Sequence, residues 1–549
     1  MVRQLSPVFA LATLLVACSS TEAGPSATPA GATAPVAAPR PALGHGAVAA
    51  DHPLASEAGA AMLRLGGNAV DAAVAAALSS GVVQPSGSGL GGGGFALVVQ
   101  KDGTAVFLDF RETAPAAATH DMFVSDGTSS QEGGLAVATP SEALGLAELE
   151  KRYGRLTPAQ VAAPAIAQAR DGYLRGTHLS ESLHSKPKMN ALFETSDGQT
   201  LRRPLLAKAL SAWADTGGRA FRDGWVAQDF VDADKAAGGI LTMADLAAYT
   251  VKDRVPLVGS WHGYTVVTAP PPSSGGIAVL QMLEATDGVD GLQCRIEAAK
   301  HAMANRAVFG GDPDFIANLS ATAASLVSPA AIAAIKQDCG PKTYNADHYG
   351  SVSAPTDHGT LHISVMDSDG MAVALTTTIN TTFGSQLIAP KSGIVLNDEM
   401  DDFTTRPGKP NAYGLIQGEN NAVGPGRRPL SSMSPTVLLG PDKRPVMAVG
   451  ASGGPFIITA TYQTIENVLL NGLSATAALD APRWHHQWLP DLVTLEPNDP
   501  RAAELTAAGH QLKTLDKPSC AVQVVHRLAD GSFEAASDPR KGGQAVVVP

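Results

Sequence analysis

A Gly359–Thr360 step at the start of a predicted strand is the pair of residues with the clearest chemical potential in the sequence. Apolar residues alternate with polar ones from there to Val365. A second apolar run, residues 371–379, follows a short turn rich in Asp and Gly, so the pattern predicts a β-hairpin. Pairing of the two strands places Thr378, to within one residue of register, opposite Thr360.

This arrangement suits self-cleavage of the chain. The hydroxyl of Thr360 can attack the carbonyl carbon of Gly359, and hydrolysis of the resulting ester leaves Thr360 as a new N-terminus. Its freed α-amine, with a reference pKa of about 7.7 to 8, is then a general base on the nucleophile's own residue. Taken alone, such a stretch more often marks an ordinary hairpin with an exposed threonine, so the rest of the chain must decide.

The elements expected around this hairpin are a mixture of helices and strands, as in one large α/β domain. They are helices at residues 53–65, 68–78, 140–152 and 158–169 and from residue 277, and strands at 95–100 and 105–110. Two of these helices are placed by Thr139–Pro140 and Thr157–Pro158, each an N-cap residue followed by a first-turn proline. The least patterned folded segment, residues 318–357, is predicted to be a surface linker that leads to Gly359.

Two features precede the hairpin. Gly87, Gly89 and Gly92 formally match a GxGxxG pattern, but they follow a helix and lead into a strand. A dinucleotide-binding loop has the reverse order, so we expect close backbone packing at these glycines instead. Arg111 lies at the exit of the predicted strand 105–110, where a side chain commonly reaches a site, although such an arginine is usually a surface charge.

The composition argues against several classes of function. The chain has 549 residues, of which 44% are hydrophobic, and a net charge of −12. It is long enough to bury a large core, and its negative charge argues against binding of nucleic acid or a basic membrane-surface patch. Because no CxxC or clustered Cys/His spacing is present, neither a metal nor a cofactor is expected. The pairs His358/His362 and His485/His486 are predicted to be structural.

The N-terminus has the features of an export signal. Residues 1–18 combine Arg3 with an apolar run that is too short to span a bilayer and that ends at Cys18. This ending resembles the lipobox of bacterial lipoproteins, where cleavage before the cysteine is coupled to its acylation. The alternative, which we favour less, is a plain signal peptide that contains a cysteine by chance. Residues 19–44 are almost entirely Ser, Thr, Ala, Pro and Gly, which predicts a flexible tether. We therefore expect an exported, periplasmic protein that meets the membrane only through a lipid anchor.

Three cysteines remain after the signal, Cys294, Cys339 and Cys520. At most one disulfide can form, and one thiol is left over. An oxidising compartment permits a bridge between Cys294 and Cys339, although the sequence alone does not establish it.

A series of ordered motifs resembles the γ-glutamyltransferase family of N-terminal-nucleophile hydrolases. The resemblance extends over nearly all of the chain after the tether. The motifs that carry it are residues 66–73, 90–95, 109–112, 270–276, Gly359-Thr360-x-His362, Thr378-x-Asn380, 397–402, 429–436, Gly453–Gly454 and 480–483. Several multi-residue matches at consistent spacing are far more specific than any one of them.

The resemblance implies an α/β fold of a particular kind, the four-layer αββα sandwich. It also implies autocleavage of one precursor into two subunits that remain together as a heterodimer. The large subunit would comprise residues 45–359, and the small subunit would comprise residues 360–549. Thr360, at the new N-terminus, would be the nucleophile.

The same resemblance implies a role for each site residue. Thr378 would orient Thr360, and backbone N–H groups of Gly453 and Gly454 would form the oxyanion hole. The remaining residues would bind the two charged groups of a γ-glutamyl donor: Arg111, Ser431 and Ser432 the α-carboxylate, and Asn380, Glu399 and Asp402 the α-ammonium. Tyr413 lies in a long loop, residues 407–425, that resembles a lid over the glutamyl-enzyme ester.

The implied activity is γ-glutamyl transfer from glutathione and its conjugates to water or to amino acid and peptide acceptors. One alternative is a related acylase acting on glutaryl or cephalosporin-type amides. Such substrates lack the α-ammonium, so retention of Asn380, Glu399 and Asp402 weighs against it. A second alternative is a non-catalytic lipoprotein that binds γ-glutamyl peptides, against which the intact Thr360 and Gly453–Gly454 argue.

Overall fold

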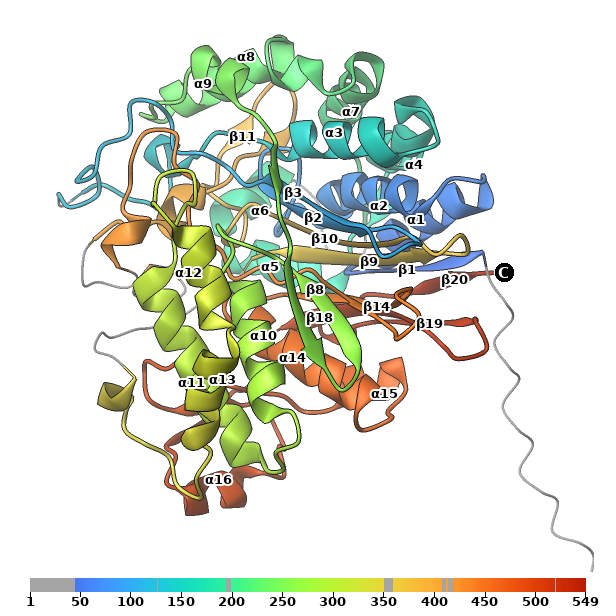
Figure 1. The fold of residues 1–549 in the computed structure, drawn as a ribbon. Coiled ribbons are helices and arrows are strands. Elements are labelled where there is room, and N and C mark those ends of the chain that lie inside the picture. The colour runs from blue at the N-terminus through green and yellow to red at the C-terminus, as the bar shows by residue number, and fades with distance from the viewer. Residues whose placement is uncertain are drawn as a thin grey trace, which may run out of the picture. The chain divides into compact units, whose positions relative to one another are not determined.

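Two antiparallel sheets packed face to face form the centre of the structure, a computed structural model. It describes residues 45–125, 127–193, 199–349, 359–406, 411–412, 418–518 and 520–549. Figure 1 shows helices on the outer side of each sheet, which gives the layers helix, sheet, sheet, helix. The predicted αββα arrangement is therefore confirmed. The predicted signal, tether, Cys18, His358 and Tyr413 all lie outside the described residues.

The strands occur in two large sheets and three small ones. In spatial order, the seven-stranded sheet contains β20 (Val546–Val548), β1 (Gly46–Ala50), β9 (Leu361–Asp367), β10 (Ala372–Thr378), β2 (Gly93–Val99), β3 (Ala105–Phe110) and β6 (Lys252–Arg254). The six-stranded sheet contains β19 (Phe533–Ser537), β18 (Ala521–Arg527), β14 (Pro445–Ser452), β13 (Thr436–Leu439), β8 (Tyr264–Thr268) and β7 (Leu257–Trp261). The small sheets pair β4 (Tyr173–Leu174) with β5 (Thr200–Leu201), β11 (Ile388–Ala389) with β12 (Ile394–Val395), and β15 (Trp484–His485) with β16 (Val493–Leu495) and β17 (Leu512–Thr514).

The helices fall into two sequential groups. The first is α1 (Pro53–Arg64), α2 (Ala69–Val83), α3 (Glu142–Tyr153), α4 (Pro158–Asp171), α5 (Thr177–Ser185), α6 (Pro187–Phe193), α7 (Pro204–Thr216), α8 (Trp225–Ala236) and α9 (Met243–Ala248). The second is α10 (Gly275–Thr286), α11 (Leu292–Phe309), α12 (Leu319–Leu326), α13 (Pro329–Gln337), α14 (Phe456–Leu469), α15 (Ala475–Asp480) and α16 (Ala502–Ala508). Helices α1, α2 and α3 pack on the seven-stranded sheet, and α10 and α14 pack on the six-stranded sheet.

Short 3-10 turns complete the described chain: η1 (Gly134–Ala136), η2 (Arg219–Phe221), η3 (Ala346–His348), η4 (Glu399–Asp402), η5 (Glu419–Asn421) and η6 (Pro539–Lys541). Within the described ranges, no single helix has the length and apolar character needed to cross a bilayer. The pair α12 and α13, bent by 49°, meets that test together by length and composition.

The alternation of side chains along the central strands explains why both faces of the seven-stranded sheet are apolar. In β1, Val48 and Ala50 belong to the core beneath α1 and α2, whereas Ala47 and Ala49 belong to the core shared with the other sheet. Successive side chains of a strand point to opposite faces, and here each face is covered. Strand β10 repeats the pattern, with larger residues toward the helices and alanines toward the partner sheet.

The predicted hairpin is confirmed, and its register lies within the one residue that the prediction allowed. Leu361 of β9 lies opposite Thr377 of β10, and His362 lies opposite Thr376. Continuing this antiparallel pairing by one residue places Thr360 beside Thr378. His362 faces the partner sheet, is fully buried and hydrogen-bonds Thr376, in keeping with a structural histidine.

Two predicted elements differ in the structure. Thr139 pairs with Thr113 in an isolated bridge, and helix α3 begins only at Glu142, so the predicted helix start at Thr139–Pro140 was wrong. The reason is that the backbone N–H of Thr139 donates to the carbonyl of Thr113 over 2.8 Å, and this bridge keeps the chain extended where the helix was expected to start. The start at Thr157–Pro158 is confirmed by a capping box.

The segment predicted to be a linker, residues 318–357, is also different. It contains α12, α13 and η3 before residues 350–358, which the structure does not describe. Leu319 and Ala323 on α12, and Ile332 and Ile335 on α13, are buried at helical spacing. The two helices are short and are separated at Ser328–Pro329, so neither gives a long amphipathic period in the sequence. For this reason the segment reads as unpatterned.

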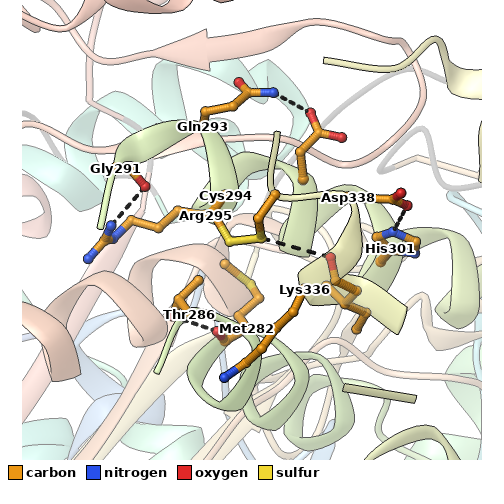
Figure 2. Close-up of a disulfide and its surroundings, with 12 residues drawn as sticks. Met282, Thr286, Gly291, Gln293, Cys294, Arg295, His301, Lys336 and Asp338 are labelled. Atoms are coloured by element: carbon orange, nitrogen blue, oxygen red, sulfur yellow. Dashed lines mark hydrogen bonds and ion pairs between the residues drawn. A yellow bond between two sulfur atoms is a disulfide. The ribbon is translucent and has the colours of Figure 1, made fainter. Parts of the chain in front are cut away.

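A disulfide links Cys294 on α11 to Cys339 just after α13 (Figure 2), as the sequence permits. Cys520 is free and buried. The bridge closes a 45-residue separation and so fixes α11 against α13.

We expect Gly450→Ala to test the packing of the two sheets. A Cβ on Gly450 of β14 would lie 2.6 and 2.7 Å from the ring nitrogens of His362 on β9. The ring is held by Thr376 and Ser364 and cannot move aside, so overpacking should cost about 1–3 kcal/mol of unfolding free energy. Thermal unfolding of both proteins measures this loss.

Gly340→Ala is the matched control, because nothing lies within 4 Å of the added methyl group. Its effect should stay within about 0.5 kcal/mol. Equal unfolding midpoints for the Gly450→Ala variant and the parent chain would contradict the close approach of the sheets.

Candidate active site

A cavity lies where the ends of the two central sheets meet. Its lining contains most of the predicted site residues, contributed by segments that are far apart in the sequence. They are Arg111, Thr360, Thr378, Asn380, Glu399, Asp402, Ser431, Ser432 and Gly454, together with Met433 and Ile457. Gly453 directly precedes Gly454, and Gly359 precedes Thr360. The structure thus gathers the predicted set in one place, except for Tyr413, which is outside the described residues.

Thr360 enters the cavity from the start of β9 and is 4% exposed. Its Oγ1 contacts the carbonyl oxygen of Gly359, the residue before it. Thr378 Oγ1, at the end of β10, lies 3.2 Å from Thr360 Oγ1 and 3.2 Å from the same carbonyl oxygen. Two hydroxyls therefore face one peptide bond from neighbouring strands.

The hydrogen bonds of Thr378 decide what its hydroxyl can do. The backbone N–H of Asn380 donates to Thr378 Oγ1 over 2.8 Å, which uses an oxygen lone pair. The hydroxyl proton is then available to Thr360 Oγ1 or to the Gly359 carbonyl. Asn380 reaches this position with φ of +72°, in the left-handed region, and its side-chain amide donates to the carbonyl of Asp398.

Lys541 contacts the backbone of Thr360. Its ammonium donates to the carbonyl of Thr360 and to Ser452 Oγ, each over 2.8 Å. Asp51, fully buried nearby, accepts from the backbone N–H of His362 and from Gln523. Burial raises the pKa of Asp51 to about 6, and Lys541 opposes the rise. The sequence analysis missed Lys541 and Asp51, because residues so distant along the chain carry no local signal.

Arg111 extends from the end of β3 and is almost completely buried. Its guanidinium pairs with Glu399 and Asp402 and donates to the carbonyls of Pro429 and Leu430. These four contacts use most of its five N–H groups. The bidentate clamp expected for a substrate carboxylate is therefore largely occupied by the protein's own groups.

Burial raises the pKa values of the carboxyl groups in this cluster. Burial raises the pKa of Glu399 well above its ordinary value and also raises that of Asp402, while Arg111 opposes both rises. Burial likewise raises the pKa of Glu112 to about 8, again against the effect of Arg111. Glu399 Oε2 receives no hydrogen bond from a described N–H or hydroxyl group, and the carboxyl beside it is that of Glu112, with which Glu399 can share a proton. A hydrogen-bond donor in the cavity would complete this group.

A second cation missed by sequence reasoning lies beside this cluster. Arg306 of α11 is 4% exposed, and its Nε has no hydrogen-bond partner within the part of the chain that the structure describes. Burial lowers its pKa to about 10, while Asp402 acts in the opposite direction. An arginine inside an ordinary helical pattern gives no sequence signal of such a position.

Ser431, Ser432 and the glycine pair line the remaining wall. Ser431 Oγ accepts from the backbone N–H of Met433, so its hydroxyl proton is available to a ligand. Gly453 and Gly454 connect β14 to α14 with φ of +133° and +55°, a path that favours glycine. Gly454 lines the same cavity as Thr360 and lies just before a helix N-terminus, where the first backbone N–H groups have no partner within the helix.

Comparisons with known proteins place this geometry in context. The sequence profile described as gamma-glutamyltranspeptidase matches residues 55–548. A "Glutathione hydrolase proenzyme" of Escherichia coli strain K12 is 38% identical over 524 residues, covering 90% of each chain.

Solved structures of two proteins resemble the fold of this chain. A cephalosporin acylase from Bacillus halodurans superposes with a TM-score of 0.80 at 26% identity, covering 94% of this chain and 99% of its own. The gamma-glutamyltranspeptidase of Helicobacter pylori is 34% identical with a TM-score of 0.52. It covers 55% of this chain and 93% of that one.

We expect Glu142→Gln to change how stability depends on pH. Glu142 is fully buried behind β10, where its Oε2 accepts from Ser88 Oγ, which in turn contacts Thr377. Burial raises its pKa to about 8. The folded state therefore binds this proton more tightly than the unfolded state, and stability is lost as the pH rises from about 4.5 toward 8. As the pH rises from 5 to 8, the thermal unfolding midpoint of Glu142→Gln should fall less steeply than that of the parent chain.

Glu148→Gln, on the partly exposed side of the same helix, is the control and should run parallel to the parent chain. A midpoint difference between Glu142→Gln and the parent that stays constant across this pH range would contradict the raised pKa.

Proposed function

The chain belongs to the gamma-glutamyltranspeptidase family, and from this we propose that it is a γ-glutamyltransferase and glutathione hydrolase. It would cleave the γ-glutamyl amide of glutathione or its conjugates and pass the glutamyl group to water or to an amino acid or peptide acceptor. The observation that carries the proposal is the position of Thr360 Oγ1, against the Gly359 carbonyl and Thr378, within a cavity that holds one arginine and two carboxylates.

The first step is maturation of the precursor. Thr360 Oγ1 attacks the carbonyl carbon of Gly359, a C–O bond forms, the C–N bond breaks, and the departing amine takes a proton. Thr378 Oγ1, 3.2 Å from the carbonyl oxygen, can donate to it as negative charge develops. Water then hydrolyses the ester, which leaves Gly359 with a carboxylate and Thr360 with a free α-amine.

The second step uses the new N-terminus. The α-amine of Thr360 takes the proton of its own hydroxyl as Oγ1 attacks the γ-carbonyl of the donor. Thr378 fixes the direction of Oγ1, and Lys541 holds the Thr360 carbonyl in place. The oxyanion would lie near the backbone N–H groups of Gly453 and Gly454. Expulsion of the donor's amine leaves a glutamyl ester, which water or an acceptor amine then attacks.

The charges of the cavity suit a zwitterion. The donor's α-carboxylate can take the remaining N–H of Arg111 and the hydroxyl of Ser431, with Ser432 beside it. Its α-ammonium can donate to Glu399 Oε2 and approach Asp402 and Asn380. The positive charge of Arg111 would thereby balance the protein's carboxylates, Glu399 and Asp402, as well as the α-carboxylate of the ligand. This role is less direct than a bidentate pair formed with the substrate alone.

The acylase alternative is supported by one observation, the structural likeness to a cephalosporin acylase. A γ-glutamyl amide has an α-ammonium, and a glutaryl amide lacks it. The protein groups that would contact this ammonium therefore decide between the two substrates. The buried Glu399 Oε2 favours the γ-glutamyl substrate, because an α-ammonium can donate a hydrogen bond to it and a glutaryl chain offers no donor at that position.

Division into two subunits and anchoring belong to the same proposal. The name proenzyme for the E. coli relative supports a precursor that is divided. So does the Helicobacter pylori chain, which corresponds to about half of this one. Residues 45–359 and 360–549 would then form a heterodimer. Export to the periplasm with a lipid on Cys18, and a lid carrying Tyr413, complete the proposal and rest on the sequence.

We expect Thr360→Ala to abolish both maturation and turnover, because it removes the only attacking atom of the scheme. A denaturing gel of the purified parent chain should give two fragments, the smaller beginning Thr360-Leu361-His362 on N-terminal sequencing. The variant should give one uncut chain.

Thr360→Ser is the matched control, since it keeps the hydroxyl and should still divide, at a lower rate. Scission at Gly359 in Thr360→Ala would remove Thr360 from the mechanism. A parent chain that stays whole would instead favour the non-catalytic binding protein.

We expect kcat/KM for a γ-glutamyl anilide to exceed that for the matching glutaryl anilide by about 10- to 100-fold. The reason is that a hydrogen bond to a charged group contributes about 1.5–3 kcal/mol. Glu399→Gln should lower this ratio by reducing the rate with the γ-glutamyl substrate, while Glu419→Gln, outside the cavity lining, should leave it unchanged.

A parent enzyme that prefers the glutaryl anilide would be an acylase. A ratio that Glu399→Gln leaves unaltered would show that another group meets the α-ammonium.

A further inference from the structure

Two histidines and an aspartate converge on one point outside the candidate active site. His301 Nε2 lies 2.8 Å from Asp338 Oδ2, and His348 Nε2 lies 2.7 Å from the same oxygen. The three potential ligand atoms all lie within 4.8 Å of one another. We propose that His301, Asp338 and His348 form a binding site for a divalent transition-metal ion, with Zn²⁺ as the ion that fits best.

The three ligands come from three different elements, which explains why no sequence spacing pointed to them. His301 lies on α11, Asp338 directly follows α13, and His348 ends η3. Figure 2 shows Asp338 reaching His301 beside the disulfide. A bound metal ion would therefore join η3 to both helices.

The disulfide positions two of the ligands in advance. Cys339, next to Asp338, is bonded to Cys294, and Cys294 lies seven residues before His301 on the same helix. Seven residues are about two turns, so Cys294 and His301 lie on one face of α11. The bridge thus holds the backbone of Asp338 against the face that carries His301.

Aromatic contacts hold both imidazole rings in place. Tyr344 stacks on His348 with ring centroids 4.3 Å apart. The ring of Tyr349 meets His301 edge-on at 4.7 Å and His348 edge-on at 4.9 Å. Each imidazole is therefore fixed by a ring contact as well as by Asp338, which lowers the entropic cost of bringing the ligands together.

The donor set matches a definite class of metal ion. Two imidazole nitrogens and one carboxylate oxygen suit Zn²⁺ and its first-row neighbours better than Ca²⁺ or Mg²⁺, which prefer oxygen. Bonds of about 2.0–2.2 Å to zinc require neighbouring donor atoms about 3.3 Å apart, so each imidazole would withdraw from Asp338 by roughly half an ångström. The side chains are 17–39% exposed, which leaves room for water as a fourth ligand.

The local charges allow a cation to bind. Lys300, the neighbouring cation on α11, is already paired with Asp491 at 3.1 Å and donates to the carbonyl of Tyr344. Glu297, one turn before His301, adds a carboxylate that is bonded to Gln293 and Tyr349. In the metal-free form, two imidazoles share one carboxylate oxygen. A metal ion would relieve this crowding by taking a nitrogen lone pair from each ring.

The test is zinc binding by the full chain, prepared without a histidine tag and stripped of metal with a chelator. Titration with ZnCl₂ against a chromophoric competitor should give one saturable site, and Co²⁺ in its place should give visible bands typical of a four- or five-coordinate ion. His348→Gln and His301→Gln should each weaken zinc affinity by at least about 10- to 100-fold, the loss seen even when an outer-shell partner is removed. Zinc should also raise the unfolding midpoint of the parent chain and leave that of His348→Gln unchanged.

His262→Gln is the matched control, because His262 also pairs with an aspartate, Asp287, in a contact to which the described residues add no third ligand. It should bind zinc as the parent chain does. Far-UV circular dichroism of the metal-free variants shows whether they fold. If His301→Gln does not fold, His348→Gln still tests the proposal, because the side chain of His348 is partly exposed. The absence of a saturable site, or zinc affinity that neither histidine variant changes, would overturn the proposal.

Discussion

The register of β9 against β10 is the constraint on which the candidate site depends. Side chains alternate between the two faces of a strand, so a slip of one residue would carry Thr360 and Thr378 away from each other and invert both cores. The register is fixed because Ile363 and Val365 must enter the helix-side core while Met366 enters the core between the sheets. Burial along the whole hairpin therefore determines the meeting of two hydroxyls at its end.

The neighbouring glycines serve the same constraint. Gly91 and Gly92 lie so close to the backbone carbonyls of Val395 and Thr378 that no Cβ could fit at either position. The glycine-rich segment thus packs directly on the end of β10, as its order of helix, loop and strand predicted. The same segment also positions α3, because the backbone N–H groups of Ser141 and Glu142, at the start of that helix, donate to the Gly92 carbonyl.

How far the sequence predicts this structure depends on whether a feature is local. The hairpin, its register to within one residue, and the helix at Thr157 follow from periodicity and capping in contiguous residues. The cavity lining could be assembled only through resemblance to a family, because its members come from separate loops. Lys541 and the cluster at His301 escaped both approaches, since contacts across 181 and 37 residues leave no trace in spacing. The helix wrongly placed at Thr139 failed because a tertiary hydrogen bond outweighed a local cap signal.

Selectivity in such a fold must come from few side chains, since the chain shares its architecture with a cephalosporin acylase at a TM-score of 0.80. Burying Arg111 beside Glu399 and Asp402 is costly unless every charge is compensated. Arg111 alone cannot compensate all of the oxygens, because one oxygen of Glu399 receives no hydrogen bond from a described N–H or hydroxyl group. A zwitterionic ligand adds one cation and one anion to this cluster without changing its net charge. A glutaryl ligand adds the anion alone and offers Glu399 no hydrogen-bond donor, and this difference favours the γ-glutamyl group.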